Sequence, residues 1–355
     1  MLTPPKEPPH FTLLITKIIS FFTRVYNLIL KLIRMPEISL SFDAVDKSSH
    51  PIAIVKGGKF DRETLYLNQG ESIGRRPKFQ PDIGRAYLSK MTSRKHGSTM
   101  KLINEAMSKG IPVEHLLTQD KGVKSMYEDI LNQQKQSDKC IKLPPESTFQ
   151  LIPPEDKRFV YYIAGPSGSG KSYIAKALAE RYQKQFPDRD VFLVSKLGED
   201  ETLDSMKHKP IRLNVQKLIE EPLKNLEPLR ESLVIFDDVD GFDKKQLDAI
   251  QLLVNDIGTM GRHTDTSMIY ISHILSDYKR TRLLLLEATH FILYPAATSA
   301  HAMTYLLKNN VGADKNEITK MRKCGSRWIC VSKQFPTYVV TEHSAWIMHQ
   351  NEEED

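Results

Sequence analysis

Residues 165–172, GPSGSGKS, fit the G-x-x-x-x-G-K-[ST] pattern of a loop that binds phosphate. Glycines let backbone N–H groups turn toward a phosphate, and the N-terminus of a following helix adds positive potential. Lys171 can reach the β- and γ-phosphates of a nucleoside triphosphate, and the Ser172 hydroxyl can ligate Mg²⁺. We therefore predict a site for ATP and Mg²⁺ that is made of Gly165, Pro166, Ser167, Gly168, Ser169, Gly170, Lys171, Ser172 and Tyr173. No motif that would distinguish ATP from GTP is visible.

Two adjacent carboxylates supply the second half of such a site. Asp237 and Asp238 follow the apolar run at residues 233–236, and ligands of open α/β sheets bind at the carboxyl ends of strands. We expect Asp237 to be the acid that holds Mg²⁺ and Asp238 to be the base for the attacking water. The alternative for Asp238, or for Asp240, is to cap the helix that follows residue 243.

A third apolar run, at residues 267–272, ends in two polar side chains. In NTPases with a strand inserted between the two nucleotide motifs, a polar residue at this position senses the γ-phosphate. We expect His273 to do so, with Ser272 in reserve; a structural histidine is the alternative. Candidates for an arginine finger, which completes a neighbouring subunit's site, are Arg262, Lys279, Arg280 and Arg282.

Apolar runs that alternate with helical patterns from residue 158 onward predict an α/β fold. We expect a P-loop NTPase of the RecA/ASCE-like type, with a mostly parallel central sheet flanked by helices. The expected strands are 159–164, 190–195, 211–214, 232–237, 267–272 and 289–294. The expected helices are 171–186, 215–229, 243–260, 277–288 and 299–309. The last two apolar runs, RWICVSK and PTYVVTEHSAWIM, predict an antiparallel pair that turns at residues 334–336.

The chain divides into an ATPase domain at residues 151–349 and a less regular N-terminal extension. A disordered leader is expected at 1–10, a region without a recognisable fold at 36–150, and an acidic tail at 350–355. Within 36–150, short strand-like pieces (ISLSF, PIAIV, TLYLN) precede a helical stretch at 113–134. Residues 71–101 are basic with interleaved aromatics, which suits either a solvated loop or contact with a phosphate backbone.

Residues 11–35 form the most apolar stretch of the extension. Lys17, Arg24 and Lys31 recur every seven residues, so a helix here would carry a narrow basic stripe opposite a wide apolar face. The spaced charges disfavour a clean membrane span. Three interpretations stay open: a helix that contacts a membrane surface, a helix that packs on the protein itself or on a partner subunit, and an upstream extension of a protein whose real start is Met35.

Composition sets wide limits on function. The chain has 355 residues, a formal net charge of +6 and only three cysteines, none of them in a zinc-finger spacing. These cysteines cannot form a disulfide framework, which favours a reducing compartment. The mild basic excess permits contact with nucleic acid.

The three motifs together resemble those of one group of viral enzymes. Walker A as GPSGSGKS, Walker B as LVIFDD, and Gly261-Arg262-His263 before a strand that ends in Ser272-His273 are similar to the genome-packaging ATPases of nucleocytoplasmic large DNA viruses. These are the poxvirus-type branch of the FtsK–HerA superfamily, and the resemblance covers roughly residues 158–345. This chain has His273 where that family usually has glutamine or asparagine.

The resemblance implies an ATP-hydrolysing motor that moves double-stranded DNA through a homo-oligomeric ring, a hexamer, to package a genome. It also implies a place in the virion or in the cytoplasm of the infected cell, with residues 11–35 as a possible anchor at an internal membrane. Three alternatives remain at this stage. They are a helicase-like NTPase that depends on nucleic acid, a small-molecule kinase, and a membrane-associated scaffold that binds nucleotide as a switch.

Overall fold

The computed structural model describes residues 38–69, 101–103, 105–106, 113–116, 118, 121–128, 139–276 and 280–348. The expectations for the leader 1–10, the helix 11–35, most of the basic segment 71–101 and the tail 350–355 lie outside these residues. Of the helical stretch expected at 113–134, a 3-10 turn at Val113–His115 and a helix at residues 121–128 are described. No helix in the described part of the chain combines the length and apolar character that crossing a membrane requires.

A ten-stranded sheet forms the centre of the molecule, in the order β4-β14-β13-β12-β11-β6-β10-β9-β7-β8. Neighbouring strands from β11 to β8 run parallel, and those from β4 to β11 run antiparallel. The parallel strands are β6 (Val160–Ala164), β7 (Val191–Ser195), β8 (Ile211–Arg212), β9 (Leu233–Asp237), β10 (Ser267–Ser272) and β11 (His290–Leu293). The mostly parallel sheet predicted from the sequence is confirmed, and β10 lies between the strands of the two nucleotide motifs.

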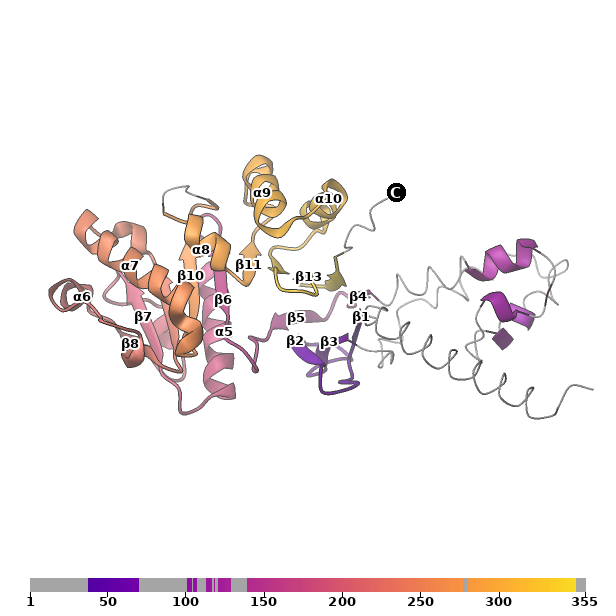
Figure 1. The fold of residues 1–355 in the computed structure, drawn as a ribbon, viewed down its shortest axis with the longest axis horizontal. Helices are drawn as coiled ribbons and strands as arrows, with labels where there is room; N and C mark the ends of the chain where they lie inside the picture. Colours follow the sequence, from indigo (N-terminus) through magenta and orange to yellow (C-terminus); the bar gives the residue numbers. More distant parts are fainter. Residues whose placement is uncertain are drawn as a thin grey trace, which may run out of the picture.

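Helices cover both faces of this sheet (Figure 1). They are α5 (Lys171–Gln185), α6 (Val215–Glu220), α7 (Lys244–Met260), α8 (Arg282–Glu287), α9 (Ala300–Leu306) and α10 (Lys315–Lys323). The helix expected at 215–229 is shorter because Pro222 disfavours helical geometry at the residue before it; a 3-10 turn, Glu227–Leu229, follows. A π-helical turn, Leu307–Val311, continues the helix expected at 299–309.

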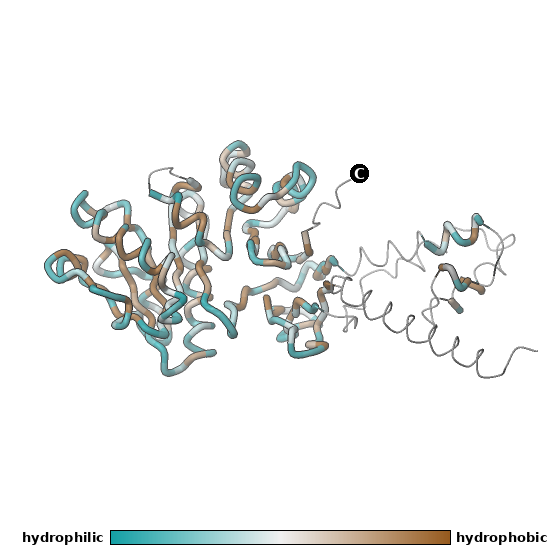
Figure 2. Tube along the Cα trace, in the orientation of Figure 1, coloured by the Kyte–Doolittle hydropathy of each residue, from teal (hydrophilic) through white to brown (hydrophobic). Residues whose placement is uncertain are grey.

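Alternate residues of the parallel strands enter two different cores, as the period of a β-strand requires. On one face, Tyr161 and Ile235 pack with the apolar side of α5. On the other face, Tyr162 and Phe236 pack with α6, α7, α8, α9 and α10. In Figure 2 the central strands are brown and the outer turns of the helices carry much of the teal. Because both faces are covered, the strands are apolar throughout and polar side chains gather at their ends.

The C-terminal region contains three antiparallel strands where the sequence predicted two. They are β12 (Ile329–Ser332), β13 (Tyr338–Thr341) and β14 (Ser344–Ile347). The second predicted strand is divided by a tight turn in which Thr341 Oγ1 accepts from the backbone N–H of His343, at 3.3 Å, and of Ser344, at 2.9 Å. The predicted turn after β12 is present.

The N-terminal region forms a second sheet of four strands, in the order β1-β3-β2-β5. These strands are β1 (Ile38–Ser41), β2 (His50–Lys56), β3 (Thr64–Gln69) and β5 (Thr148–Leu151). Its apolar residues join the same core as α5. The strand β4 (Cys140–Lys142) pairs with β14, so the large sheet takes in residues from before the domain boundary that we expected at residue 151.

Candidate nucleotide-hydrolysis site

The phosphate-binding loop joins the carboxyl end of β6 to the start of α5. Gly168 and Gly170 have φ of 73° and 99°, values that side-chain-bearing residues rarely adopt, and a Cβ at either position would meet open space. Gly165 is constrained differently, because a Cβ there would come within 2.7 Å of the Tyr294 ring. The loop is therefore open above the helix N-terminus and closed against β11.

Lys171 is the first residue of α5 and is nearly buried, with 6% of its surface exposed. Its ammonium group donates to the carbonyl oxygen of Pro166 at 2.9 Å and lies 3.4 Å from Nδ1 of His273. Burial lowers the pKa of this ammonium group, while the charges of Asp237 and Asp238 oppose that shift. The cation is thus held at the mouth of the loop, where phosphate oxygens would lie.

Asp237 ends β9 and is almost completely buried. Its carboxylate accepts from Ser172 Oγ at 3.1 Å, and this contact joins the two nucleotide motifs. Burial, followed by the charge of Asp238, raises the pKa of Asp237 to about 6, and the bond from Ser172 opposes the shift. A buried carboxylate of raised pKa gains most from a cation, so this pair fits the Mg²⁺ site expected from the sequence.

Asp238 follows in the left-handed conformation, with φ of 51°. Its carboxylate is about one-third exposed, at 38%, and lies 3.2 Å from Nε2 of His273. The helix α7 is capped by Asp243, which forms a reciprocal capping box with Gln246. The side chain of Asp238 makes no capping bond. It therefore faces the loop and solvent, as a group that activates water must.

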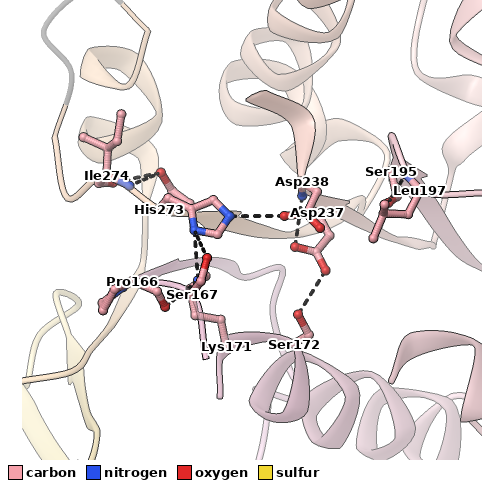
Figure 3. A network of polar contacts seen from close by, with 11 residues as sticks. Pro166, Ser167, Lys171, Ser172, Ser195, Leu197, Asp237, Asp238, His273 and Ile274 are labelled. Atoms are coloured by element: carbon pink, nitrogen blue, oxygen red, sulfur yellow. Dashed lines mark hydrogen bonds and ion pairs between the residues drawn. The ribbon is translucent and has the colours of Figure 1, made fainter. Parts of the chain in front are cut away.

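His273 connects the two halves of the site (Figure 3). Its Nε2 faces Asp238, and its Nδ1 lies 3.5 Å from Ser167 Oγ as well as near Lys171. Ser272, the reserve candidate, turns away and donates to the carbonyl oxygen of Ile274 at 2.8 Å. The structure thus brings the side chain of His273, and not that of Ser272, to the loop.

The loop also contains a polar group that suits a ligand. Ser169 Oγ is buried and has no hydrogen-bond partner among the described residues. Buried hydroxyl groups are normally paired, so this oxygen fits a phosphate oxygen as its partner. Together with the open space at Gly168 and Gly170, it makes the residues present compatible with a bound triphosphate.

The candidate arginine fingers lie at the rim. Arg280 is about half exposed, and its guanidinium lies 3.5 Å from the carboxylate of Asp240, just beyond β9. Arg282 is exposed at the start of α8, and Arg262 contacts the neighbouring His263. Lys279 lies outside the described residues. The structure therefore places Arg280 beside Asp240 of its own chain, and the finger role stays a prediction.

Tyr294 is part of the site that sequence reasoning missed. It follows β11 directly, its ring closes one side of the loop at Gly165, and its buried hydroxyl has no partner among the described residues. It lies far from the loop along the chain, and no local motif marks it. An aromatic residue at the end of the strand expected at 289–294 was the only available signal.

Comparisons with known proteins agree with this geometry. Residues 161–290 match the model of the ATPase family associated with various cellular activities (AAA). Uncharacterized protein V3 of Sputnik virophage is 34% identical over 221 residues, which are 61% of this chain and 87% of that protein.

Two solved structures are among those similar to this chain. The genome packaging NTPase B204 from Sulfolobus turreted icosahedral virus 2, in complex with ATP-gammaS, is 14% identical with a TM-score of 0.36, over 53% of this chain and 97% of that chain. The pCW3 conjugation coupling protein TcpA, monomer form with ATPgS, is 13% identical with a TM-score of 0.38, over 82% of this chain and 77% of that chain.

Proposed function

Since this chain belongs to the family of protein V3 of Sputnik virophage and is a P-loop ATPase, we propose that it hydrolyses ATP to drive double-stranded DNA into a viral particle. The proposal of ATP hydrolysis is supported by a chain of contacts in which His273 lies between Lys171 and Asp238. Beside it, the hydroxyl of Ser172 donates to the carboxylate of Asp237. A cation for phosphate, oxygen ligands for a metal and a base for water thus occupy one end of the parallel strands.

Each side chain has a distinct task in this chemistry. Lys171 and the loop N–H groups hold the phosphates, while Ser172 and Asp237 would hold Mg²⁺, which neutralises phosphate charge when bound. Asp238 accepts the proton of the attacking water. His273 orients the Asp238 carboxylate through Nε2, and its Nδ1 lies close enough to Lys171 to respond when phosphate arrives.

The DNA-translocating part rests on three further observations. The segment Gly261-Arg262-His263 and the strand that ends at His273 resemble the packaging ATPases of large DNA viruses, and the related protein V3 comes from a virophage. The net charge of +6 suits a polyanionic substrate. We propose a homo-oligomeric ring, a hexamer, in which Arg280 or Arg282 completes the site of the neighbouring subunit. Such a motor would act in the virion or in the cytoplasm of the infected cell.

The test is steady-state ATP hydrolysis by the full chain without DNA, with single-stranded DNA and with double-stranded DNA. We expect strong stimulation by duplex DNA, lost in Lys171→Ala and Asp238→Asn and kept in the matched controls Lys245→Ala and Asp248→Asn, both exposed on α7. Stimulation by single strands alone would favour a helicase-like enzyme. Hydrolysis that ignores all DNA would contradict the motor.

Membrane contact through residues 11–35 is a separate proposal, supported by their spaced basic residues. The measurement is flotation with anionic liposomes, comparing the full chain with residues 35–355. Equal flotation of the two proteins would rule out this segment as the anchor.

A further inference from the structure

We infer that a groove beside the phosphate-binding loop holds the base of the nucleotide and that it takes a purine. This inference rests on the proposed ATPase function, because it names the part of the substrate that the loop itself does not hold. The groove has a volume of about 230 Å³. Its lining residues include Phe149, Gln150, Tyr173, Ala177, Arg327 and Trp328.

The groove lies close to the phosphate-binding loop, as a site for the base must. Tyr173 directly follows Ser172, the last residue of the loop, so the groove begins within one residue of the phosphate-binding groups. Arg327 and Trp328 immediately precede β12, whose first residue Ile329 pairs with Leu293, the last residue of β11. They therefore lie at the carboxyl end of β11, next to β6 and its loop.

The order of the strands determines toward which side of the loop the base of the nucleotide points. The carboxylates of β9 lie on one side of β6, across β10, whereas β11 and β12 lie on the other side. The terminal phosphate of a bound triphosphate must face Asp238 and His273 for water to attack it. The opposite end of the nucleotide, with its sugar and base, is then directed toward β11 and β12. The groove is at that end.

The lining of the groove matches a planar, mostly apolar ring. Phe149, Leu178 and Trp328 are buried and form an apolar floor. Tyr173 remains 57% exposed, which is unusual for so large a ring and leaves its face free to stack on a base. The volume is about eight times the share of one water molecule in the liquid, which is enough for a bicyclic base.

A guanidinium group that also lines the groove lies against a carboxylate. Glu342 accepts from the backbone N–H of Arg327 at 2.7 Å, and its other oxygen lies 3.5 Å from Nε of the same arginine. The Arg327 side chain is 63% exposed. An oriented planar cation and a tyrosine ring are the groups that stack on bases, and the larger ring of a purine offers more contact to both.

A second groove along α5 shares Lys56, Gln150, Tyr173 and Ala177 with the first, but the rest of its lining differs. It has a volume of about 450 Å³ and is lined mainly by charged residues: Lys56, Lys176, Glu180, Arg181 and Lys184. A base gains little from such walls, because stacking and burial of its ring need apolar or aromatic surface. The smaller groove with the buried floor is therefore the base site.

The experiment compares the affinities of the full chain for ATP, GTP, CTP and inorganic tripolyphosphate, all with Mg²⁺. Tripolyphosphate shares the phosphates but has no base. We expect Tyr173→Ala to weaken ATP binding about tenfold or more, from the loss of one stacking partner, and to leave tripolyphosphate binding unchanged. Arg327→Ala should act in the same direction. Tyr173→Phe should bind ATP as the wild type does, which separates loss of stacking from loss of folding.

The matched control is Tyr305→Ala, which removes another exposed tyrosine ring, at α9, and should change no affinity. In the wild type, ATP and GTP should bind more tightly than CTP; equal binding of CTP would overturn the assignment of a purine. If Tyr173→Ala leaves ATP binding unchanged, or weakens ATP and tripolyphosphate equally, the base-site inference fails although the ATPase stands. If the wild type binds neither nucleotide nor tripolyphosphate, the proposed function itself fails.

Discussion

The two halves of the ten-stranded sheet use polar residues in opposite ways. In the parallel half, the end of β9 and the residue after β10 present Asp237 and His273 to a shared space, where they contact groups of the loop. In the antiparallel half and its neighbouring helices, polar side chains turn inward. Glu317 of α10 accepts from Trp346 Nε1 at 3.0 Å, and both residues are buried.

This difference follows from strand direction. Parallel strands bring all their carboxyl ends to one edge of the sheet, so side chains far apart in the sequence meet there. Backbone groups at these strand ends that the sheet does not pair can also bind a ligand. The antiparallel strands β12, β13 and β14 are joined by short connections, and polar groups near them, such as Thr341 Oγ1 and Glu317, bind neighbouring groups. Substitutions of the polar residues at the carboxyl ends of the parallel strands should therefore change catalysis, and those of polar residues buried within the sheet or in the antiparallel half should change stability.

The largest expected effect is on turnover, from Lys171→Ala. Loss of a buried cation aimed at the phosphates should lower kcat by about 100-fold to 1000-fold. Steady-state hydrolysis with saturating ATP measures it, and thermal unfolding should show a folded protein. Activity near that of the wild type would mean that this loop does not hold the transferred phosphate.

The second effect, from Asp238→Asn, separates chemistry from binding. An amide cannot accept the proton of water, so kcat should fall by about 100-fold or more while ATP affinity stays within a few-fold of the wild type. Single-turnover hydrolysis and equilibrium binding measure the two quantities. A parallel loss of affinity would place Asp238 among the binding groups instead.

A third effect is on the pH dependence of the unfolding free energy, through the buried side chain of His290. His290 is buried against Tyr161, with Tyr338 and Thr289 in contact with its ring nitrogens, and burial lowers its pKa to about 3 from an ordinary 6.5. Below pH 6.5 the unfolded chain takes up a proton that the folded chain does not. As the pH is lowered from 6.5 to 5, the free energy of unfolding should therefore fall, by about 1 kcal/mol per pH unit from this group.

Denaturant unfolding of the wild type and His290→Gln at several pH values measures this slope. The variant is expected to have a shallower dependence on pH in that range, whatever its overall stability. Replacement of the exposed His301 by glutamine provides the matched control. An unchanged slope in His290→Gln would show that this histidine is not the titrating group.

The last effect is expected at Glu317 and concerns stability alone. Glu317→Ala leaves the indole N–H of Trp346 buried without its acceptor, which should cost about 1–3 kcal/mol of unfolding free energy. Glu317→Gln retains an acceptor oxygen and should cost less. Both variants should hydrolyse ATP at the wild-type rate per folded molecule. A change in kcat would contradict the claim that polar residues of the antiparallel half affect stability and not catalysis.

Local patterns predicted much of the parallel half. The apolar run before Gly165 and the helix formers after Ser172 placed β6 and α5, and the run before Asp237 placed β9. These elements are continuous in the sequence, and their signals are periodicity and glycine. The proximity of Lys171, Asp238 and His273 also followed, because strand ends of a parallel sheet meet.

Other features depend on contacts that no local pattern records. The helix α10 was missed because it is short and polar, although Asp314 and Glu317 have the spacing of a helix start and Asp314 does accept from the Glu317 N–H. The pairing of β4 with β14 joins segments that are far apart along the chain. The Thr341 turn was overlooked within an apolar run, where its hydroxyl was the available signal.

The pairing of β4 with β14 also determines where this protein can be cut. β4 and β5 are neighbours in the chain, yet β4 enters the large sheet and β5 enters the small one, so residues 140–151 join both sheets. A truncated protein that starts at residue 151 would leave β14 paired with β13 on one side and without its partner β4 on the other. Unpaired strands of this kind recruit other chains, so such a fragment would tend to aggregate. The shortest soluble fragment should therefore begin before Cys140.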